Sequence, residues 1–114
     1  MKLIIAGSRK FNNYSILIER VLEFIKDEKP TIISGTASGA DQLGERLARE
    51  HKFDLIQMPA DWDGLGRRAG IVRNEEMAKI ATHCIVFWDG ESPGTKHMIQ
   101  MCKKYNLVYE VVRI

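Results

Sequence analysis

Short apolar runs alternate with amphipathic helical patterns along the whole chain, and this alternation constrains the fold more than any other feature. Apolar residues recur at helical spacing, which predicts helices over residues 14–25, 40–52, 72–81 and 95–105. Strand-like runs lie before, between and after these segments, at residues 3–6, 31–34, 54–58, 83–88 and 107–112. Repeated strand–helix–strand units of this kind build a parallel sheet with helices on both faces.

The hydrophobicity of the strands predicts their order in the sheet. Residues 3–6 and 83–88 form the most apolar strands, and strands covered on both faces lie at the centre of a parallel sheet. We therefore expect one α/β domain over residues 1–114, with a five-stranded parallel sheet in the order 3-2-1-4-5. In that order the chain reverses direction between the first and fourth strands, which is where ligands bind in open α/β sheets.

Three turns rich in glycine and hydroxyl residues follow the first, second and fourth strands, and each precedes a predicted helix. Because the carboxyl ends of parallel strands meet at one edge of the sheet, we expect these turns to lie close together. Glycines there let the backbone approach a ligand, and helix N-termini offer free N–H groups to a phosphate. The turns therefore predict a nucleotide- or phosphate-binding surface. The residues predicted to bind are Gly7, Ser8, Arg9, Ser34, Gly35, Ser38, Gly39, Asp41, Asp89, Gly90, Ser92, Gly94, Thr95 and Lys96.

Some of these side chains suggest specific roles. Arg9 could clamp a phosphate through two hydrogen bonds, as a lysine could not. Asp41 has two interpretations that the sequence leaves open, a hydrogen bond to a ribose hydroxyl and a bracing of its own loop. Lys96 lies in the first turn of a predicted helix, where a cation opposes the helix dipole, which favours a functional role. His97, beside it, is expected to be a plain surface residue.

A long predicted loop, residues 59–70, adds further candidates before the third predicted helix. Trp62 in this loop and Trp88 at the end of the fourth strand could sandwich a base. Arg73 and Asn74, near the start of the helix, are a second predicted phosphate contact.

Length, charge and cysteine content limit the function classes. The chain has 114 residues with 17 basic and 15 acidic side chains, and its net charge of +2 is far below the excess of a protein that holds nucleic acid by charge alone. Cys84 and Cys102 are expected to be buried free thiols, and no histidine has metal-ligand spacing, so we predict no metal and no cofactor. No apolar run reaches the roughly 18 residues of a membrane span. We expect a cytoplasmic protein that does not contact membranes.

The three turns resemble the motifs of the SLOG superfamily, which includes Lonely Guy nucleotide-processing enzymes, the DNA-processing protein A domain, and small YspA-like and YpsA-like proteins. The matching motifs are Gly7-Ser8-Arg9, Ser34-Gly35-x-Ala37-x-Gly39-Ala40-Asp41 and Gly90-x-Ser92-x-Gly94-Thr95. The small YspA-like branch also shares Pro59-Ala60-Asp61-Trp62, Gly70-x-x-Arg73-Asn74 and Gly94-Thr95-Lys96-His97. The resemblance implies a single Rossmann-like domain that binds nucleotides or nucleotide-derived ligands.

One departure from the Lonely Guy pattern bears on catalysis. Those enzymes carry Pro-Gly-Gly-x-Gly-Thr-x-x-Glu, whereas this chain has Met98 at the position of the Glu and lacks the preceding double glycine. A thioether cannot act as a general base, which argues against N-glycosidic hydrolysis by that route. If the protein is nevertheless an enzyme, Glu75 and Asp61 are the carboxylates that could substitute.

We therefore expect the protein to bind a nucleotide or a nucleotide-derived small molecule, as a sensor, a sequestering protein or a diverged nucleotide-processing protein. One alternative is single-stranded nucleic-acid binding of the DNA-processing protein A kind, although the chain lacks a basic stripe and a winged-helix domain. The other is a phosphoribohydrolase-like N-glycosidic hydrolase. Small SLOG proteins tend to be oligomeric, and we expect a homodimer or larger assembly through the apolar helix residues Met77, Ile80, Met98, Ile99 and Met101.

Overall fold

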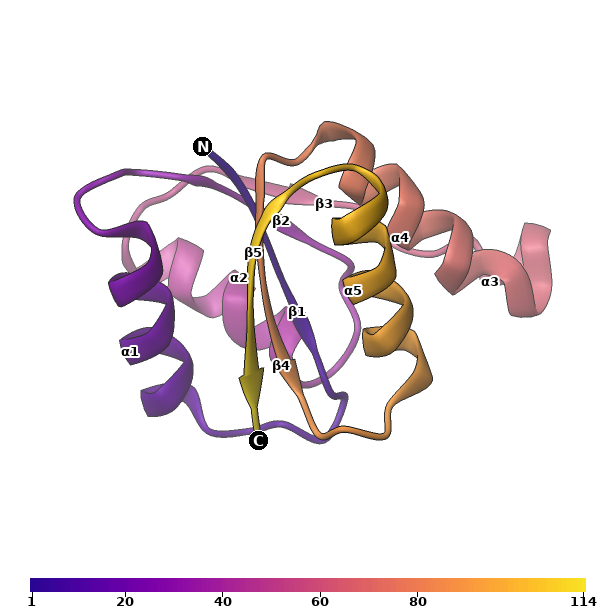
Figure 1. Ribbon diagram of the computed structural model, residues 1–114, viewed down its shortest axis with the longest axis horizontal. Coiled ribbons are helices and arrows are strands. Elements are labelled where there is room, and N and C mark those ends of the chain that lie inside the picture. Colours follow the sequence, from indigo (N-terminus) through magenta and orange to yellow (C-terminus); the bar gives the residue numbers. More distant parts are fainter.

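The five strands form one parallel sheet in the order β3-β2-β1-β4-β5, as predicted. The structure is a computed structural model that describes residues 1–114 (Figure 1). Its strands are β1 (Lys2–Gly7), β2 (Thr31–Ser34), β3 (Leu55–Gln57), β4 (His83–Trp88) and β5 (Val108–Arg113). Its helices are α1 (Tyr14–Ile25), α2 (Ala40–Glu50), α3 (Trp62–Leu65), the short 3-10 helix η1 (Gly66–Arg68), α4 (Ala69–Ile80) and α5 (Pro93–Lys104).

Strand β1 lies at the centre of the sheet, between β2 and β4. Ile4 is in register with Ile33 of β2 on one side and with Cys84 of β4 on the other. All neighbouring strands are parallel, so the turns after β1, β2 and β4 emerge at the same edge. The reversal of chain direction between β1 and β4 therefore lies at the centre of that edge, as the hydrophobicity of these two strands predicts.

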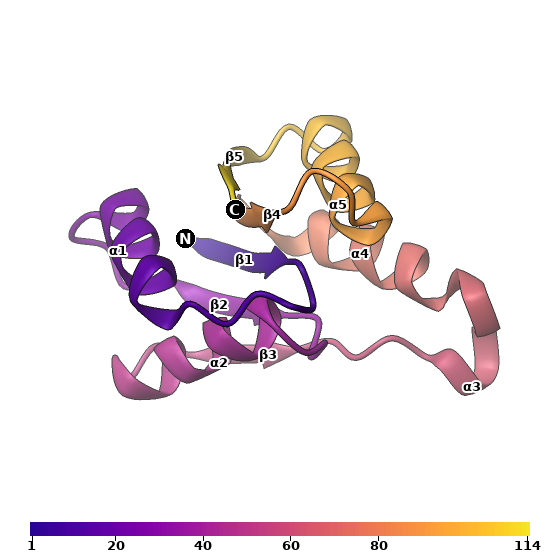
Figure 2. The same cartoon turned by 90° about the horizontal axis from the view of Figure 1, so that it is seen from below.

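Helices cover both faces of the sheet. Alternate residues of β1 point to opposite faces: Leu3 and Ile5 pack with α1 and α2, whereas Ile4 and Ala6 pack with α4 and α5. Figure 2, which looks along the sheet from below, shows α1 and α2 separated from α4 and α5 by the strands. Helix α1 has the predicted bounds, and Asn13 caps it by accepting a hydrogen bond from the amide of Ile16 at 3.1 Å.

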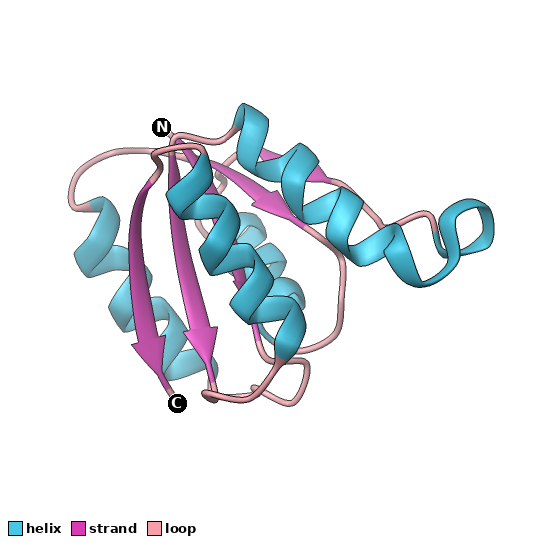
Figure 3. Ribbon diagram, turned by 45° about the vertical axis from the view of Figure 1, so that its right-hand side comes forward, coloured by secondary structure: helices cyan, strands magenta, loops and turns pink.

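The segment predicted as a loop, residues 59–70, is largely helical, so that prediction is wrong. Asp61 caps α3 by accepting a hydrogen bond from the amide of Gly64 at 2.9 Å, and α4 begins at Ala69 rather than at residue 72. The several glycines of the segment obscured its helical tendency, because glycine disfavours helix interiors. Figure 3 shows that α3 projects beyond the sheet at the amino end of α4.

The apolar helix residues on which the oligomer prediction rested are mostly covered within one chain. Met77, Met98 and Ile99 are buried between α4, α5 and the sheet, so they leave no apolar surface for a partner. Ile80 is the member of this set that stays exposed, at 40%; outside the set, Ile71 is 55% exposed and Trp62 is 51% exposed. Cys84 and Cys102 are both buried and free, as predicted. None of the helices combines the length and hydropathy needed to cross a membrane.

Candidate functional site

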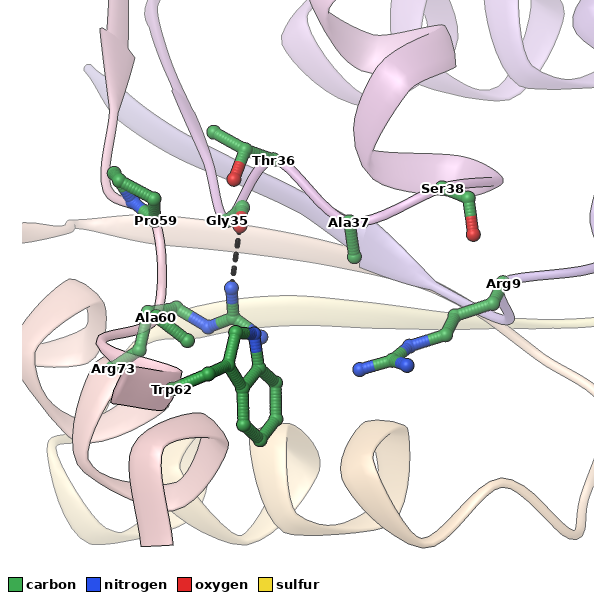
Figure 4. A pocket seen from close by; sticks show the side chains of 9 residues that line it. All are labelled: Arg9, Gly35, Thr36, Ala37, Ser38, Pro59, Ala60, Trp62 and Arg73. Atoms are coloured by element: carbon green, nitrogen blue, oxygen red, sulfur yellow. Dashed lines mark hydrogen bonds between the residues drawn. The ribbon is translucent and has the colours of Figure 1, made fainter. Parts of the chain in front are cut away.

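A cleft lies at the carboxyl edge of the sheet, beside the reversal between β1 and β4. It has a volume of about 690 Å³, and a side cavity of about 220 Å³ adjoins it. The turns after β1 and β4 line the cleft together with α4, and the turn after β2 lines the side cavity. Both cavities share Arg9, Ala37, Trp62 and Arg73. Figure 4 shows the side chains of Arg9, Trp62 and Arg73 extending into the same space.

Most of the residues predicted to bind a ligand line one or both cavities. These are Gly7, Ser8, Arg9, Gly35, Ser38, Asp41, Trp62, Arg73, Asn74, Asp89, Ser92, Gly94 and Thr95. The predicted residues outside both linings are Ser34, Gly39, Gly90, Lys96 and the two nominated carboxylates, Asp61 and Glu75. Distant parts of the sequence thus meet at one edge of the sheet.

Backbone hydrogen bonds to neighbouring segments hold the turn after β1 in place, and the Arg9 side chain takes no part in them. The amide of Ser8 donates to the carbonyl of Phe87 at 2.9 Å, and the Ser8 carbonyl accepts from the amide of Ala40 at 3.2 Å. Gly39 has a φ of +79°, and a Cβ there would collide with the Ser8 carbonyl and approach the Arg9 carbonyl carbon to 2.6 Å. Gly39 therefore allows two turns to pack together, and Arg9, which forms no ion pair, reaches the cleft.

The turn after β2 is braced from below by Ser34. Its hydroxyl donates to Glu45 Oε2 at 2.7 Å and accepts from the amide of Thr36 at 3.0 Å. This arrangement holds Thr36 at a φ of +65°, in the left-handed region that a β-branched residue disfavours. Backbone strain of this kind concentrates at ligand-binding sites. Ser34 is fully buried, so it shapes the turn and does not line a cavity.

Asp41, in the first turn of α2, is a buried carboxylate at the wall of the cleft. Its Oδ2 accepts a hydrogen bond from the amide of Ala37 at 3.2 Å. Burial raises the pKa of Asp41 to about 6; the hydrogen bond from Ala37 and the positive charges of Arg73 and Arg9 offset part of that effect. Asp41 therefore braces its own loop through Oδ2, as one of the two interpretations expected.

Arg73 reaches from α4 across the cleft to the turn after β2. One terminal nitrogen, Nη1, donates to the carbonyl of Gly35 (Figure 4). Nε donates to Asn74 Oδ1 at 3.1 Å. A Cβ on Gly35 would lie 2.8 Å from both the Arg73 Cζ and Asp41 Oδ2, so this glycine makes room for the guanidinium. A guanidinium carries five N–H groups, and the remaining ones are available to a ligand. Burial lowers the pKa of Arg73.

Asn74 joins α4 to the beginning of α5 and to His97. Its Nδ2 donates to the carbonyl of Gly94 at 3.2 Å and lies 3.2 Å from His97 Nδ1. An amide nitrogen can only donate, so Nδ1 is an acceptor and the imidazole proton is assigned to Nε2. Burial lowers the pKa of His97, which favours the neutral ring. His97, which was expected to be a plain surface residue, lines the cleft.

The turn after β4 is organised by Asp89. Its carboxylate accepts hydrogen bonds from the amides of Glu91 at 2.9 Å and Ser92 at 2.8 Å, and from the Ser92 hydroxyl at 2.8 Å. These bonds lower the pKa of Asp89 to about 2. Helix α5 begins at Pro93, two residues before the predicted start, because proline suits the first helical position. The amides of Gly94 and Thr95, in its first turn, have no backbone partner.

The two nominated catalytic carboxylates have other partners. Glu75 accepts hydrogen bonds from Lys104 Nζ at 2.6 Å and from the Tyr105 hydroxyl at 2.8 Å, which lower its pKa. Asp61 caps α3. No group of three His, Cys, Asp or Glu side chains is arranged to hold a metal ion.

Trp62 and Trp88 do not face each other across the cleft. Trp88 packs in the apolar cluster under α5, and its Nε1 donates to the Ser92 carbonyl at 3.3 Å. Trp62 lines both cavities, and the Arg9 guanidinium lies 5.9 Å from the centre of its ring. The predicted sandwich of a base between the two tryptophans is therefore wrong, and only Trp62 offers a stacking face to a ligand.

Several lining residues were not among the predicted ligand contacts. Among them are Lys10, Arg67, Ile71, Glu91, His97 and Met98 at the cleft, and Pro59 and Ala60 at the side cavity. Arg67 belongs to the segment that was expected to be a loop, and Ile71 lies between that segment and the predicted start of the helix at residue 72, so their helical placement could not be used. Asp61, a favoured N-cap residue, was the signal in the sequence that could have predicted a helix beginning at Trp62.

Comparisons with known proteins place the chain in a family. The sequence model of the YspA, cpYpsA-related SLOG family (YAcAr) matches residues 1–64, which include the turns after β1 and β2. The chain is also similar to the Gene 61 protein of Mycobacterium phage D29, with 29% identity over 111 residues that cover 90% of this chain and 89% of the phage protein. No solved structure matches the chain.

Proposed function

Because the chain belongs to the YspA, cpYpsA-related SLOG family, we propose that it binds a nucleotide or a nucleotide-derived small molecule in the cleft at the carboxyl edge of the sheet. The observation that carries this proposal is the meeting of Arg9, Arg73 and Trp62, from three separate segments, around one space. Two guanidinium groups suit phosphate oxygens, and an exposed indole suits the flat face of a base.

The size and charge of the cleft support the same ligand class. A volume of about 690 Å³ lies within the range of roughly 300–1,000 Å³ typical of small-molecule sites. Lys10 and Arg67 join Arg9 and Arg73 in the lining, which also holds three acidic side chains, Asp41, Asp89 and Glu91. The first turn of α5 adds free amides at Gly94 and Thr95, which can bind a phosphate without a charged side chain.

We favour binding without hydrolysis. Met98, at the position where the Lonely Guy pattern has its Glu, lines the cleft and is 1% exposed. A thioether can contact a ligand there but cannot transfer a proton. A role as a sensor or as a sequestering protein fits a site that has lost this carboxylate.

The proposal is tested by a thermal-shift screen of nucleotides, cyclic dinucleotides and ADP-ribose, followed by isothermal titration calorimetry of each hit. A ligand at 100 times its Kd raises the free energy of unfolding by about 2.7 kcal/mol. The Arg9→Ala variant should then bind about 10- to 150-fold more weakly, because a charged hydrogen bond is worth about 1.5–3 kcal/mol.

Arg46→Ala is the matched control, because Arg46 lies on α2 outside both cavities and pairs with Glu50 at 3.0 Å. It should bind as the parent protein does. The proposal fails if no compound in the screen binds, or if Arg46→Ala and Arg9→Ala weaken binding equally.

Binding of a single-stranded oligonucleotide would indicate a different ligand class. A protein that contacts several phosphates loses affinity steeply as salt rises, whereas a mononucleotide site loses little. We therefore expect an oligo(dT) probe to bind no more tightly than a mononucleotide and to show no steeper salt dependence. A steep dependence together with tighter binding would favour the DNA-processing protein A kind of function.

A further inference from the structure

Asp41 has one carboxylate oxygen in use and one without a partner. Oδ2 accepts the hydrogen bond from Ala37, which is the only hydrogen bond of the Asp41 side chain. Neither Arg9 nor Arg73 forms an ion pair with it. The residue is 5% exposed and lines the cleft. Since every fully buried side-chain oxygen in the structure has a partner, the free Oδ1 must face the cleft.

A carboxylate oxygen that faces the cleft without a partner limits what a ligand can place beside it. Its negative charge repels phosphate, and a ligand that covers this acceptor without donating a hydrogen bond to it loses binding free energy. The group that fits is a hydroxyl or an N–H. The surrounding charges of Arg9 and Arg73 nevertheless favour an anionic ligand. A compatible ligand therefore carries a hydrogen-bond donor close to its phosphate.

The sugar of a ribonucleotide meets both requirements. It joins the phosphate to the base, and it carries hydroxyl donors between the two. Trp62, the stacking face for a base, is 51% exposed, whereas Asp41 is buried in the wall near Arg9 and Arg73. The group nearest to Asp41 in such a ligand is the sugar rather than the base edge.

We propose that Asp41 Oδ1 accepts a hydrogen bond from a ribose hydroxyl, and that the cleft selects ribonucleotides over deoxyribonucleotides. This inference rests on the proposed nucleotide binding and specifies its ligand class. The selection comes from the acceptor itself: with a deoxyribose, Oδ1 is left buried without a donor, and the free energy of binding is reduced.

The test measures binding of ADP, GDP, CDP and UDP and of their 2′-deoxy and 3′-deoxy forms by isothermal titration calorimetry. For the nucleotide that binds, we expect at least one deoxy form to bind about ten-fold more weakly, equivalent to about 1.4 kcal/mol. Equal binding of all three forms by the parent protein overturns the inference, and this comparison needs no variant.

Asp41→Asn provides an independent readout. The amide oxygen can keep the hydrogen bond from Ala37, which turns the NH₂ group, a donor, toward the sugar. The preference for ribose should then fall below about three-fold, with most of the loss on the ribonucleotide. Asp54→Asn, at an exposed position outside the cleft, is the control and should keep the parent's preference.

The outcomes separate this inference from the proposed function. If ribose and deoxyribose forms bind equally and Arg9→Ala weakens both, nucleotide binding stands and the role of Asp41 fails. An Asp41→Asn variant that keeps the full preference also refutes the role of Asp41. If none of the twelve compounds binds, the inference is refuted, and the proposed nucleotide binding falls with it only if no compound of the thermal-shift screen binds either.

Discussion

Replacing Asp41 by Asn should stabilise the unliganded protein at neutral pH. Burial raises the pKa of Asp41 from its ordinary value of 3.8 to about 6, so the folded state disfavours the ionised carboxylate. The folded protein therefore holds a proton that the unfolded chain has released between these two pH values. As pH rises through this window, the folded state loses stability, and above pH 6 the loss is complete.

The size of the effect follows from the two pKa values. A difference of about 2 corresponds to about 3 kcal/mol of free energy of unfolding. Asn removes the charge but accepts the hydrogen bond from Ala37 more weakly than a carboxylate does, which costs about 1 kcal/mol. We expect Asp41→Asn to gain about 2 kcal/mol at pH 8 and to lose this advantage near pH 4. Burial and the hydrogen bond from Ala37 have the largest effects on the pKa of Asp41; among the charged neighbours, Arg73 and Arg9 lower it and Glu45 raises it.

The assay is urea unfolding followed by circular dichroism at several pH values from 4 to 8, without ligand. A gain of about 2 kcal/mol moves the urea midpoint by about 1 M or more for a domain of this size. Asp54→Asn, at an exposed position, should show no comparable gain. The reasoning is refuted if Asp41→Asn is less stable than the parent at pH 8, or if its advantage does not change with pH.

Three further predictions concern the turns and the surface. Thr36→Gly should raise the free energy of unfolding by about 1 kcal/mol in urea, because it relieves a β-branched residue at a φ of +65°; a loss of stability would contradict the strain. Gly39→Ala should lower the free energy of unfolding by about 2 kcal/mol or more, because the added Cβ would collide with the Ser8 carbonyl. Gly94→Ala is the control, because a Cβ there meets open space; equal effects of the two variants would refute the packing argument. We expect light scattering at tens of micromolar to report a homodimer that Ile71→Glu converts to a monomer, because Ile71 is 55% exposed; a parent protein of single-chain mass would exclude this assembly.

The fold could be predicted from the sequence because its signals are local. The period of apolar residues distinguishes helices from strands, and Asn13 marks the start of α1. The two most apolar strands, β1 and β4, had to lie at the centre, and that choice places the three turns at one edge. The segment around α3 was mispredicted because its helix is short and rich in glycine, so no period could be recognised.

The candidate site was predictable only to the level of which turns would meet. Its details depend on contacts between residues far apart in the chain, such as Arg73 with the carbonyl of Gly35 and Asn74 with His97. Gly39 and Gly35, which the sequence suggests for ligand approach, also make room for a neighbouring group of the protein. Which oxygen of Asp41 is bound and which is free is likewise set by packing, because burial and hydrogen bonding are properties of the folded chain. The sequence thus determined the sheet, its order and the edge at which the three turns meet, and the tertiary structure decided which contacts each side chain at that edge makes.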